Sequence, residues 1–241
     1  MQKPGKVYLI GAGPGDPGLF TLKGQRILQK ADVVIYDRLA SPAILNMARS
    51  DAEKIYVGKI SGRHALSQEE INQLLVEKAR QGLTVARLKG GDPFLYGRGG
   101  EEALFVRQHG LEFEVVPGVT SAIAVPAYAG IPVTHRDMTS TFAVITGHEK
   151  PDKKESSINW EHVAPGIGTL VFLMGVENLP FICSNLIKHG RDSQTPVALI
   201  RWGTLPEQQV LTGTLDNIVD LVREHNFKPP EIGRASCRER V

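Results

Sequence analysis

The chain has 241 residues, of which 41% are hydrophobic and 22% are charged, and its formal net charge is +2. This composition is typical of a folded globular protein, with enough length for one large α/β domain or two small ones. The small net charge argues against binding to nucleic acid or membranes by bulk electrostatics. No apolar run reaches the ~20 residues of a membrane span, and residues 1–5 lack the apolar segment of a signal peptide. Two distant cysteines and seven scattered histidines predict neither a disulfide framework nor a metal site, so we expect a cytoplasmic protein without bound metal.

Strands and helices are expected to alternate along the first half of the chain. The clearest helix begins with Ser-Gln-Glu-Glu at residues 67–70, a capping box, and carries Ile71, Leu74, Leu75 and Ala79 on one face. Such alternation predicts an α/β fold, with a mostly parallel sheet covered by helices on both faces. The predicted strands are residues 6–10, 33–36, 54–57, 84–88 and 113–116, and further helices are expected after Thr21 and around Ala103, Leu104 and Val106.

The second half predicts a separate mixed α/β domain. Pro117 and Gly118 indicate the boundary, which gives an N-terminal domain of residues 1–117 and a C-terminal domain of residues 118–232. Residues 148–157 are polar and predict a loop. The other expected elements are helices at 120–129, 178–188 and 215–223, and strands at 142–146, 170–173, 197–200 and 209–211.

The last nine residues do not continue this pattern. Residues 233–241 read Gly-Arg-Ala-Ser-Cys-Arg-Glu-Arg-Val, where an apolar closing strand is expected. A basic arm for nucleic acid is one interpretation. A cloning-derived or frame-shifted extension is favoured, so we expect this tail to lie outside the fold.

The most informative stretch is residues 87–102, in which a strand runs into a loop with five glycines. Glycine permits positive φ and lets a ligand approach the backbone closely, and Asp92 with Pro93 predicts a turn. Open α/β sheets bind ligands at the carboxyl ends of their strands. A ligand site is therefore favoured over a long surface turn. The five glycines are Gly90, Gly91, Gly97, Gly99 and Gly100.

A second glycine-rich loop, at residues 11–18, fails both common nucleotide patterns. The dinucleotide fingerprint requires glycine where Asp16 stands, and a phosphate-binding loop requires lysine where Leu19 stands. Pro14 and Pro17 also remove two backbone donors that a phosphate would use. The loop suits a cationic or neutral ligand, with a tight strand-to-helix turn as the alternative.

Two ionisable residues, Asp37 and Lys59, each follow a predicted strand. In a parallel sheet these positions lie on one rim, where a carboxylate and an ammonium can take and give protons. The alternative, favoured on spacing alone, is a capping aspartate and a solvated lysine.

Later positions also leave two interpretations open. Thr120 and Ser121 are either helix caps or ligand contacts. His135 and Arg136 either bind an anion or are solvated. Met174 ends a strand, where it either belongs to the core or flanks a flat aromatic ring.

Several motifs occur together in a fixed order. The most specific are Arg-Leu-Lys-Gly-Gly-Asp-Pro-Phe at residues 87–94 and Gly-Ile-Pro-Val-Thr-His-Arg at 130–136. The chain from about residue 6 to 232 thereby resembles the tetrapyrrole methyltransferases, and among them the uroporphyrinogen-III C-methyltransferases. The remaining matching motifs are residues 11–18, 36–38, 57–59, 95–102, 117–121 and 146–148.

This resemblance implies a function and an assembly. The expected protein is a homodimer of two-domain subunits, with S-adenosyl-L-methionine in the cleft between the domains and S-adenosyl-L-homocysteine as product. The expected reaction methylates uroporphyrinogen III at C2 and C7 to give precorrin-2, for sirohaem and cobalamin. The alternatives are a methyltransferase of the same fold that acts on a later corrin, RNA or protein, and a non-catalytic ligand-binding protein. The departure of residues 233–241 from the family's apolar ending puts stability or full activity in doubt.

The resemblance also assigns roles to single residues. Asp37 matches the family's proposed proton acceptor and Lys59 its proposed proton donor. Arginines on predicted loops are expected to bind the carboxylates of the acidic substrate, with solvated surface charge as the alternative. The matched cofactor contacts are Pro14, Gly90, Gly91, Asp92, Leu95, Thr120, Ser121, Met174 and Gly203, and the expected substrate-binding arginines are Arg38, Arg63, Arg98 and Arg136.

Overall fold

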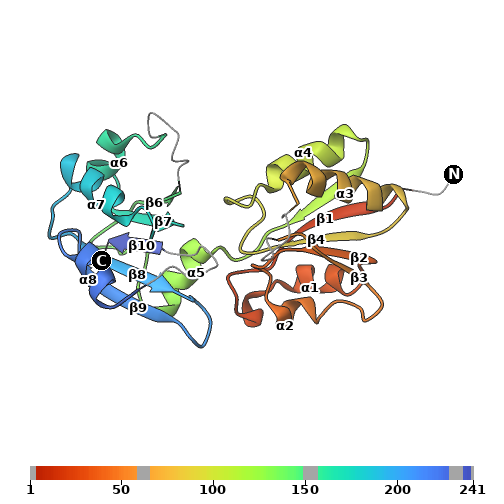
Figure 1. The fold of residues 1–241 in the computed structure, drawn as a ribbon, viewed down its shortest axis with the longest axis horizontal. Coiled ribbons are helices and arrows are strands. Elements are labelled where there is room, and N and C mark those ends of the chain that lie inside the picture. Colours follow the sequence, from red (N-terminus) through yellow and green to blue (C-terminus); the bar gives the residue numbers. More distant parts are fainter. Residues whose placement is uncertain (1–3, 59–65, 149–156, 228–235, 240–241) are drawn as a thin grey trace. The chain divides into compact units, whose positions relative to one another are not determined.

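The computed structural model describes residues 4–58, 66–148, 157–227 and 236–239. It divides into two compact units, unit 1 (Met1–Ser121) and unit 2 (Ala122–Val241), each built from strands and helices (Figure 1). The expected α/β fold class is thus confirmed. The division falls after Ser121, a little beyond the boundary that the sequence suggests at Pro117.

Unit 1 is built on a five-stranded sheet in which every pair of neighbours is parallel. The strand order is β3-β2-β4-β1-β5, so β4 and β1 lie inside the sheet with partners on both sides. All the carboxyl ends of these strands therefore share one edge. The strands are β1 (Lys6–Gly11), β2 (Val33–Tyr36), β3 (Glu53–Tyr56), β4 (Val85–Lys89) and β5 (Glu112–Val116).

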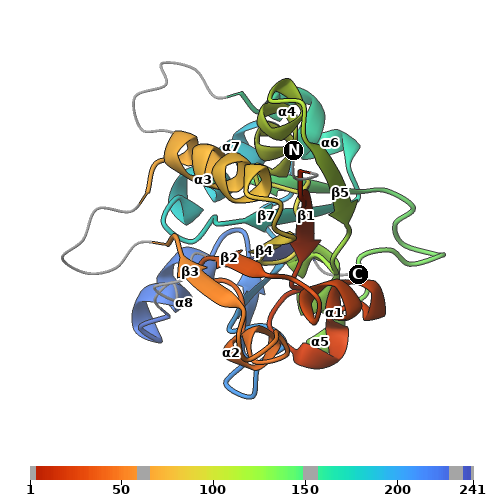
Figure 2. The same ribbon diagram turned by 90° about the vertical axis from the view of Figure 1, so that its right-hand side faces the viewer.

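Helices cover both faces of this sheet (Figure 2). One face packs its core against α3 and α4, and the other packs against α1 and α2. Thr21 caps α1 and Ser67 forms the predicted capping box of α3. Leu104 was expected on the apolar side of α4 but is 59% exposed, whereas Val106 is buried. The helices are α1 (Leu22–Leu28), α2 (Pro42–Leu45), α3 (Gln68–Arg80) and α4 (Gly99–Gln108).

Unit 2 contains a mixed five-stranded sheet in the order β6-β7-β10-β8-β9. Leu170 and Phe172 of β7 join Val197 and Leu199 of β8 in one apolar core, which α6, α7 and α8 supply with further apolar side chains. The strands are β6 (Phe142–Thr146), β7 (Thr169–Leu173), β8 (Pro196–Arg201), β9 (Gln209–Thr214) and β10 (Ser236–Glu239), and the helices are α5 (Ser121–Tyr128), α6 (Trp160–Gly166), α7 (Leu179–Lys188) and α8 (Ile218–Glu224).

The structure overturns one expectation about the C-terminal tail. Residues 233–241 were expected outside the fold, but Ser236–Glu239 forms β10, which is antiparallel to both β7 and β8. A strand is held by backbone N–H and C=O groups, which every residue except proline carries in full. A segment without an apolar pattern can therefore still occupy the gap between two strands that each need a partner.

Two helices were also missed. Helix α2 is only Pro42–Leu45, too short to show a helical period. Helix α6 begins at Trp160, whose ring stacks on Phe172 at a centroid distance of 6.1 Å. This anchoring contact joins two segments apart in sequence, so no local pattern reveals it.

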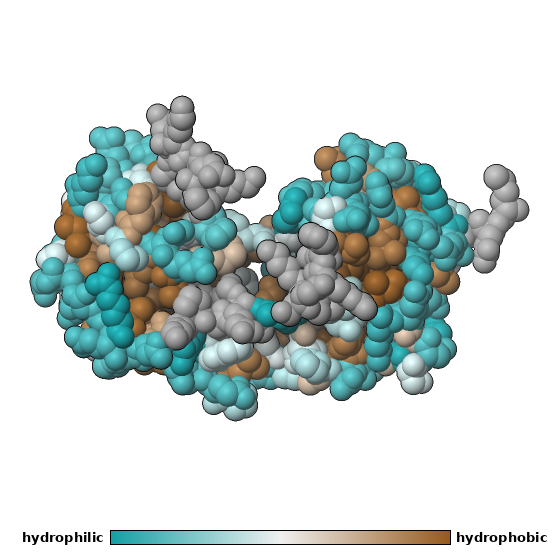
Figure 3. Space-filling view, viewed as in Figure 1, coloured by the Kyte–Doolittle hydropathy of each residue, from teal (hydrophilic) through white to brown (hydrophobic). Residues whose placement is uncertain are grey.

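On the face shown in Figure 3, polar residues alternate with patches of apolar residues in each unit. Large exposed apolar side chains include Leu22, Phe94, Leu104 and Met138. In the part of the chain that the structure describes, no helix combines the length and apolar character needed to cross a membrane.

Candidate active site

Three loops of unit 1 meet at the carboxyl edge of its sheet. Gly13, beyond β1, and Gly91, beyond β4, exchange backbone hydrogen bonds of 3.1 Å and 2.6 Å. The Asp92 carboxylate accepts a bond of 3.0 Å from the Gly118 N–H, just beyond β5. These bonds join the two glycine-rich loops and the Pro-Gly segment into one cluster, at the edge where α/β sheets bind ligands.

The cluster depends on glycine because the backbones touch. A Cβ on Gly11 would lie 2.5 Å from Gly118 Cα, and a Cβ on Gly118 would overlap the carbonyl oxygen of Gly91. Gly91 itself has φ +68°, and nothing lies within 4 Å of the position where its Cβ would be. Open space beside this glycine gives a ligand room to approach the backbone.

The Asp92 side chain holds the loops together. One carboxylate oxygen accepts from Phe94 N at 2.8 Å and from Leu95 N at 3.2 Å, while the other accepts from Gly118 N. Three backbone donors thus engage a carboxylate that the resemblance assigned to the cofactor. The structure gives Asp92 a bracing role, and its contact with a cofactor stays a prediction.

Arg98 has a similar local role. Its guanidinium pairs with Glu101 through bonds of 2.9 Å and 2.6 Å, and its backbone takes φ 58° at the start of α4. The hydrogen bond between the two side chains raises the pKa of Arg98 and lowers the pKa of Glu101. This geometry indicates that Arg98 supports the loop, and its binding of substrate carboxylates stays a prediction.

Asp37 lies directly beyond β2, at the same carboxyl edge. Its Oδ1 accepts from Leu39 N at 2.9 Å, and its Oδ2 pairs with Arg87 Nη2 at 3.2 Å. The side chain is 24% exposed, so it is held from within the protein yet remains accessible. Both sequence interpretations are therefore compatible with the geometry, since Asp37 caps a turn and also presents a carboxylate.

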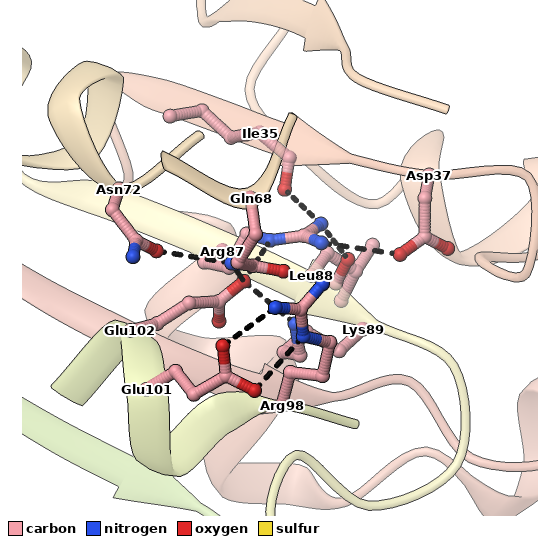
Figure 4. Close-up of polar contacts among 10 residues, drawn as sticks. All are labelled: Ile35, Asp37, Gln68, Asn72, Arg87, Leu88, Lys89, Arg98, Glu101 and Glu102. Carbon is pink, nitrogen blue, oxygen red and sulfur yellow. Dashed lines mark hydrogen bonds and ion pairs between the residues drawn. The ribbon is translucent and has the colours of Figure 1, made fainter. Parts of the chain in front are cut away.

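Sequence reasoning missed a group of buried charges behind Asp37 (Figure 4). Arg87 and Lys89 on β4 both pair with Glu102 on α4, and all three side chains are at most 5% exposed. Burial, followed by repulsion from Arg87, lowers the pKa of Lys89, while Glu102 opposes that change. The only sequence signal was the alternation Arg-Leu-Lys in a strand that was otherwise expected to be apolar.

The candidate residues of unit 2 lie at strand ends with unusual backbone conformations. Met174, after β7, has φ 60°, and Trp202 and Thr204, which flank Gly203 after β8, have φ 52° and 68°. Residues other than glycine adopt such angles at a cost, and they cluster at functional sites. The two predicted cofactor contacts Met174 and Gly203 thus lie in strained turns, whose role remains a prediction.

The other predicted residues divide into described and undescribed positions. Arg38 and Arg136 are exposed, whereas Pro14 is buried, and Thr120 and Ser121 lie half-buried at the start of α5. Lys59 and Arg63 fall outside the described residues, so their roles stay predictions. Among the residues that the structure describes, no group of three His, Cys, Asp or Glu side chains is placed to hold a metal ion.

Comparison with known proteins identifies the family. The sequence pattern of the tetrapyrrole (corrin/porphyrin) methylases matches residues 6–219. The chain belongs to this family. A uroporphyrinogen-III C-methyltransferase of Priestia megaterium is 55% identical over 228 residues, which cover 95% of each protein. An S-adenosyl-L-methionine-dependent uroporphyrinogen III methyltransferase of Methanosarcina barkeri is also 55% identical, over 95% of this chain and 89% of that protein.

Solved structures agree with this assignment. The uroporphyrin-III C-methyltransferase of Thermus thermophilus, in complex with S-adenosyl homocysteine, is 39% identical with a TM-score of 0.80, covering 98% of this chain and 97% of that one. A cobalt precorrin-4 methyltransferase is 28% identical with a TM-score of 0.84, covering 97% and 94%. The tetrapyrrole methylase fold expected from the sequence is therefore confirmed.

Proposed function

We propose that this protein transfers methyl groups from S-adenosyl-L-methionine to uroporphyrinogen III, at C2 and C7, to give precorrin-2. The observation that carries the proposal is the cluster of three loops at the carboxyl edge of the unit 1 sheet, with the accessible Asp37 carboxylate on the same edge. The names of relatives at 55% identity over nearly the whole chain support the choice of substrate and methyl donor.

The residues of the loop cluster fit a cofactor without phosphate. The Asp16 carboxylate accepts a hydrogen bond from the Gly18 N–H at 2.7 Å, so this donor is already engaged. Pro14 and Pro17 have no N–H that could bind an anion. Acidic side chains and missing donors disfavour a pyrophosphate but suit a sulfonium, which is cationic. The backbone of Gly90, Gly91 and Leu95 would line the cofactor, with Pro14, Thr120 and Ser121 as further contacts. The family resemblance also assigns Met174 and Gly203 to the cofactor.

The methyl donor, when bound, supplies an electrophilic carbon attached to a positively charged sulfur. A pyrrole carbon of the substrate forms the new C–C bond as the C–S bond breaks, and the sulfur keeps the electron pair. The methylated ring is then cationic and must lose a proton to become neutral. The Asp37 carboxylate is the group of unit 1 that we assign to this proton, with Lys59 as the proposed donor.

The protein's main contribution is placement of the two reactants. Holding them in line accounts for about 7–11 kcal/mol in intramolecular comparisons. Rigid loops serve this purpose, and the three backbone bonds to Asp92 make one such loop stiff. The proposed carboxylate-binding side chains of the substrate site are Arg38, Arg63, Arg98 and Arg136, of which Arg98 already shares its guanidinium with Glu101.

The direct test is to incubate the purified protein with S-adenosyl-L-methionine and uroporphyrinogen III without oxygen, and to measure the product mass. We expect the mass of two added methyl groups, with a singly methylated intermediate at early times. A product of unchanged mass, together with retained binding of the methyl donor, would reject uroporphyrinogen III as the substrate.

Two aspartates that flank β2 offer a matched pair for testing the proposed base. Asp32 precedes the strand and pairs with Arg49 at 3.0 Å, whereas Asp37 follows the strand and pairs with Arg87. We expect Asp37→Ala to lower kcat by about 10²–10⁴-fold, the contribution of a general base, while calorimetry finds the affinity for the methyl donor unchanged. Asp32→Ala should reduce stability and leave kcat near the wild-type value. Equal turnover in the two variants would remove Asp37 from the mechanism.

A second candidate substrate is a later corrin intermediate. The cobalt precorrin-4 methyltransferase has the higher TM-score, 0.84 against 0.80, although its identity is lower, 28% against 39%. Methylation of a corrin but not of uroporphyrinogen III in the same assay would favour this alternative.

We also propose that the protein acts in the cytoplasm as a homodimer, as the family resemblance implies. Sedimentation of the purified protein tests the assembly. A single species with twice the chain mass of 26.3 kDa is expected, and a monomer that methylates at full rate would exclude the dimer as a requirement.

A further inference from the structure

Three ionised side chains lie inside unit 1, where its sheet packs against α3 and α4. We call Arg87, Lys89 and Glu102 the buried ion cluster; their side chains are 4%, 5% and 0% exposed. The neighbouring positions of β4, Val85 and Leu88, are fully buried and apolar. Removing an ion from water costs free energy. Charged side chains inside an otherwise apolar strand are therefore expected only where they are well paired or have a functional role.

Glu102 is the centre of the cluster. Its Oε1 accepts from Lys89 Nζ at 2.7 Å, from Arg87 Nε at 3.1 Å and from Gln68 Nε2 at 3.2 Å. Gln68 is itself anchored on Asn72 Oδ1 at 3.0 Å. Glu102 Oε2 is buried and makes no hydrogen bond within the described residues, so the cluster is not optimised for stability alone.

The Arg87 guanidinium connects this interior to the reactive edge of the sheet. Its Nη1 donates to the carbonyl oxygens of Leu88 at 3.1 Å and Ile35 at 3.4 Å, while Nε donates to Glu102. Nη2 points the other way and pairs with Asp37 (Figure 4). Because the guanidinium is planar and rigid, contacts at its inner end fix the direction of its outer end.

The charges of the buried ion cluster balance only when Asp37 is counted with it. Arg87 and Lys89 carry two positive charges, and Glu102 and Asp37 carry two negative charges. Burial, followed by repulsion from Arg87, lowers the pKa of Lys89, and attraction to Glu102 opposes this change. Glu102 therefore keeps two adjacent cations in place, and Asp37 completes the balance from the accessible side.

We propose that Arg87 is a positioning residue for Asp37, held in its own place by Glu102 and Lys89. Arg87 touches neither substrate nor cofactor in this assignment and acts through the Asp37 carboxylate. Leu39 N fixes one oxygen of that carboxylate and Arg87 fixes the other, which sets the direction from which a proton can be accepted. The inference rests on the proposed methyl transfer, in which Asp37 takes the proton.

The test is a double-mutant cycle of Arg87→Lys and Asp37→Asn, assayed with S-adenosyl-L-methionine and uroporphyrinogen III. Lysine keeps the charge but cannot bridge Glu102 and Asp37 with a planar fork. We expect R87K to lower kcat by roughly tenfold to a hundredfold, the scale of a misplaced reacting group, with both KM values within about twofold. In the D37N background the same change should alter kcat by less than about twofold, because the residue through which Arg87 acts has lost its charge.

A half-buried arginine of unit 2 serves as the control. Arg191 donates to the carbonyl oxygens of Ala164 and Ile167, and burial lowers its pKa. Arg191→Lys should lower the melting temperature and leave kcat unchanged. If R87K costs the same factor with and without Asp37, or if R191K lowers kcat equally, the ion cluster is only a structural element and the proposal is wrong.

Two further measurements keep the proposal testable if R87K folds poorly or the substrate differs. Glu102→Gln retains an acceptor oxygen but removes the charge that holds Arg87, and it should show the same dependence on Asp37. A crystal structure of R87K or E102Q should show the Asp37 carboxylate displaced or in two conformers, whatever substrate is turned over. An unmoved carboxylate would overturn the inference, whereas absence of methyl transfer in the wild-type protein would reject only the proposed function.

Discussion

The two units bury different kinds of polar side chain. Among the described residues, unit 1 buries the ionised Arg87, Lys89 and Glu102, while unit 2 buries hydroxyls, such as those of Thr169 and Thr195. An ion in the interior costs several kcal/mol unless it is paired, whereas a threonine hydroxyl finds a partner on the nearby backbone far more cheaply. Unit 1 thus contains buried ions whose desolvation costs free energy, and one of them, Arg87, pairs with the accessible Asp37.

Left-handed backbone directly after a strand distinguishes unit 2, because the described left-handed non-glycine residues of unit 1, Tyr96 and Arg98, lie in the loop before α4. Met174, Trp202 and Thr204 all have positive φ and all follow strands. A left-handed residue with a side chain costs roughly 1–2 kcal/mol. The two units thus differ in what lies beside their strand ends, which is buried, paired charge in unit 1 and left-handed turns in unit 2.

The largest expected effect comes from deleting residues 236–241. The deletion removes β10 and leaves β7 and β8 with facing rows of unpaired backbone groups. Hydrogen exchange followed by mass spectrometry should show that β7 and β8 lose protection while β1 and β4 keep theirs. Unchanged protection in β7 and β8 would mean that the tail contributes nothing to the sheet, as the sequence had suggested.

A smaller loss of stability is expected when a side chain is added to a glycine at a backbone contact of unit 1. Gly118→Ala places a methyl group against the carbonyl oxygen of Gly91 and should cost about 1–3 kcal/mol, the usual penalty of overpacking. Gly100→Ala in α4 is the matched control, since nothing lies within 4 Å of its new methyl group. That variant should gain about 0.5–1 kcal/mol from helix propensity.

Urea unfolding followed in each unit separately distinguishes these outcomes. The Gly118→Ala loss should appear in unit 1 and should be accompanied by weaker binding of S-adenosyl-L-methionine. Equal stability of the two alanine variants would show that the three loops do not pack as tightly as their glycines indicate.

Local sequence signals predicted much of unit 1. The capping box at Ser67 fixes the start of α3, and the glycines beyond β1 and β4 mark the loops that meet at the sheet edge. Such signals work because a cap or a turn depends on residues close in sequence. Unit 2 was predicted less well, since β10 is positioned by two strands far from it in the chain.

The buried ion cluster could not be predicted from the sequence either, because its residues are far apart in the chain. Arg87 and Glu102 stand fifteen positions apart, on a strand and a helix, and only the packing of α4 brings them together. The sequence suggested Asp37 from its place after a strand, and the resemblance gave it a role. Neither pointed to Arg87, because a charged residue within an apolar strand has no partner that can be read locally.

The smallest expected effect concerns an ion pair at the surface of unit 1. Glu114 on β5 accepts from Lys23 at 2.6 Å and from Lys6 at 2.7 Å, and these bonds, that of Lys23 first, lower its pKa below the ordinary 4.5. A carboxyl with a lowered folded-state pKa stabilises the fold above its unfolded pKa, and this contribution disappears as the pH falls through the folded value.

Glu114→Gln should therefore cost less than about 1 kcal/mol at neutral pH, as expected for an exposed pair. Its deficit should shrink as the pH falls from 4.5 through the lower folded-state pKa, where the folded wild-type carboxyl becomes protonated. Urea unfolding from pH 7 to pH 3 measures this difference, with Glu207→Gln in an exposed loop of unit 2 as the control. A deficit that stays constant with pH would mean that Glu114 stabilises β5 through packing. The ion pairs of Glu114 with Lys6 and Lys23 would then contribute nothing measurable to the stability of unit 1.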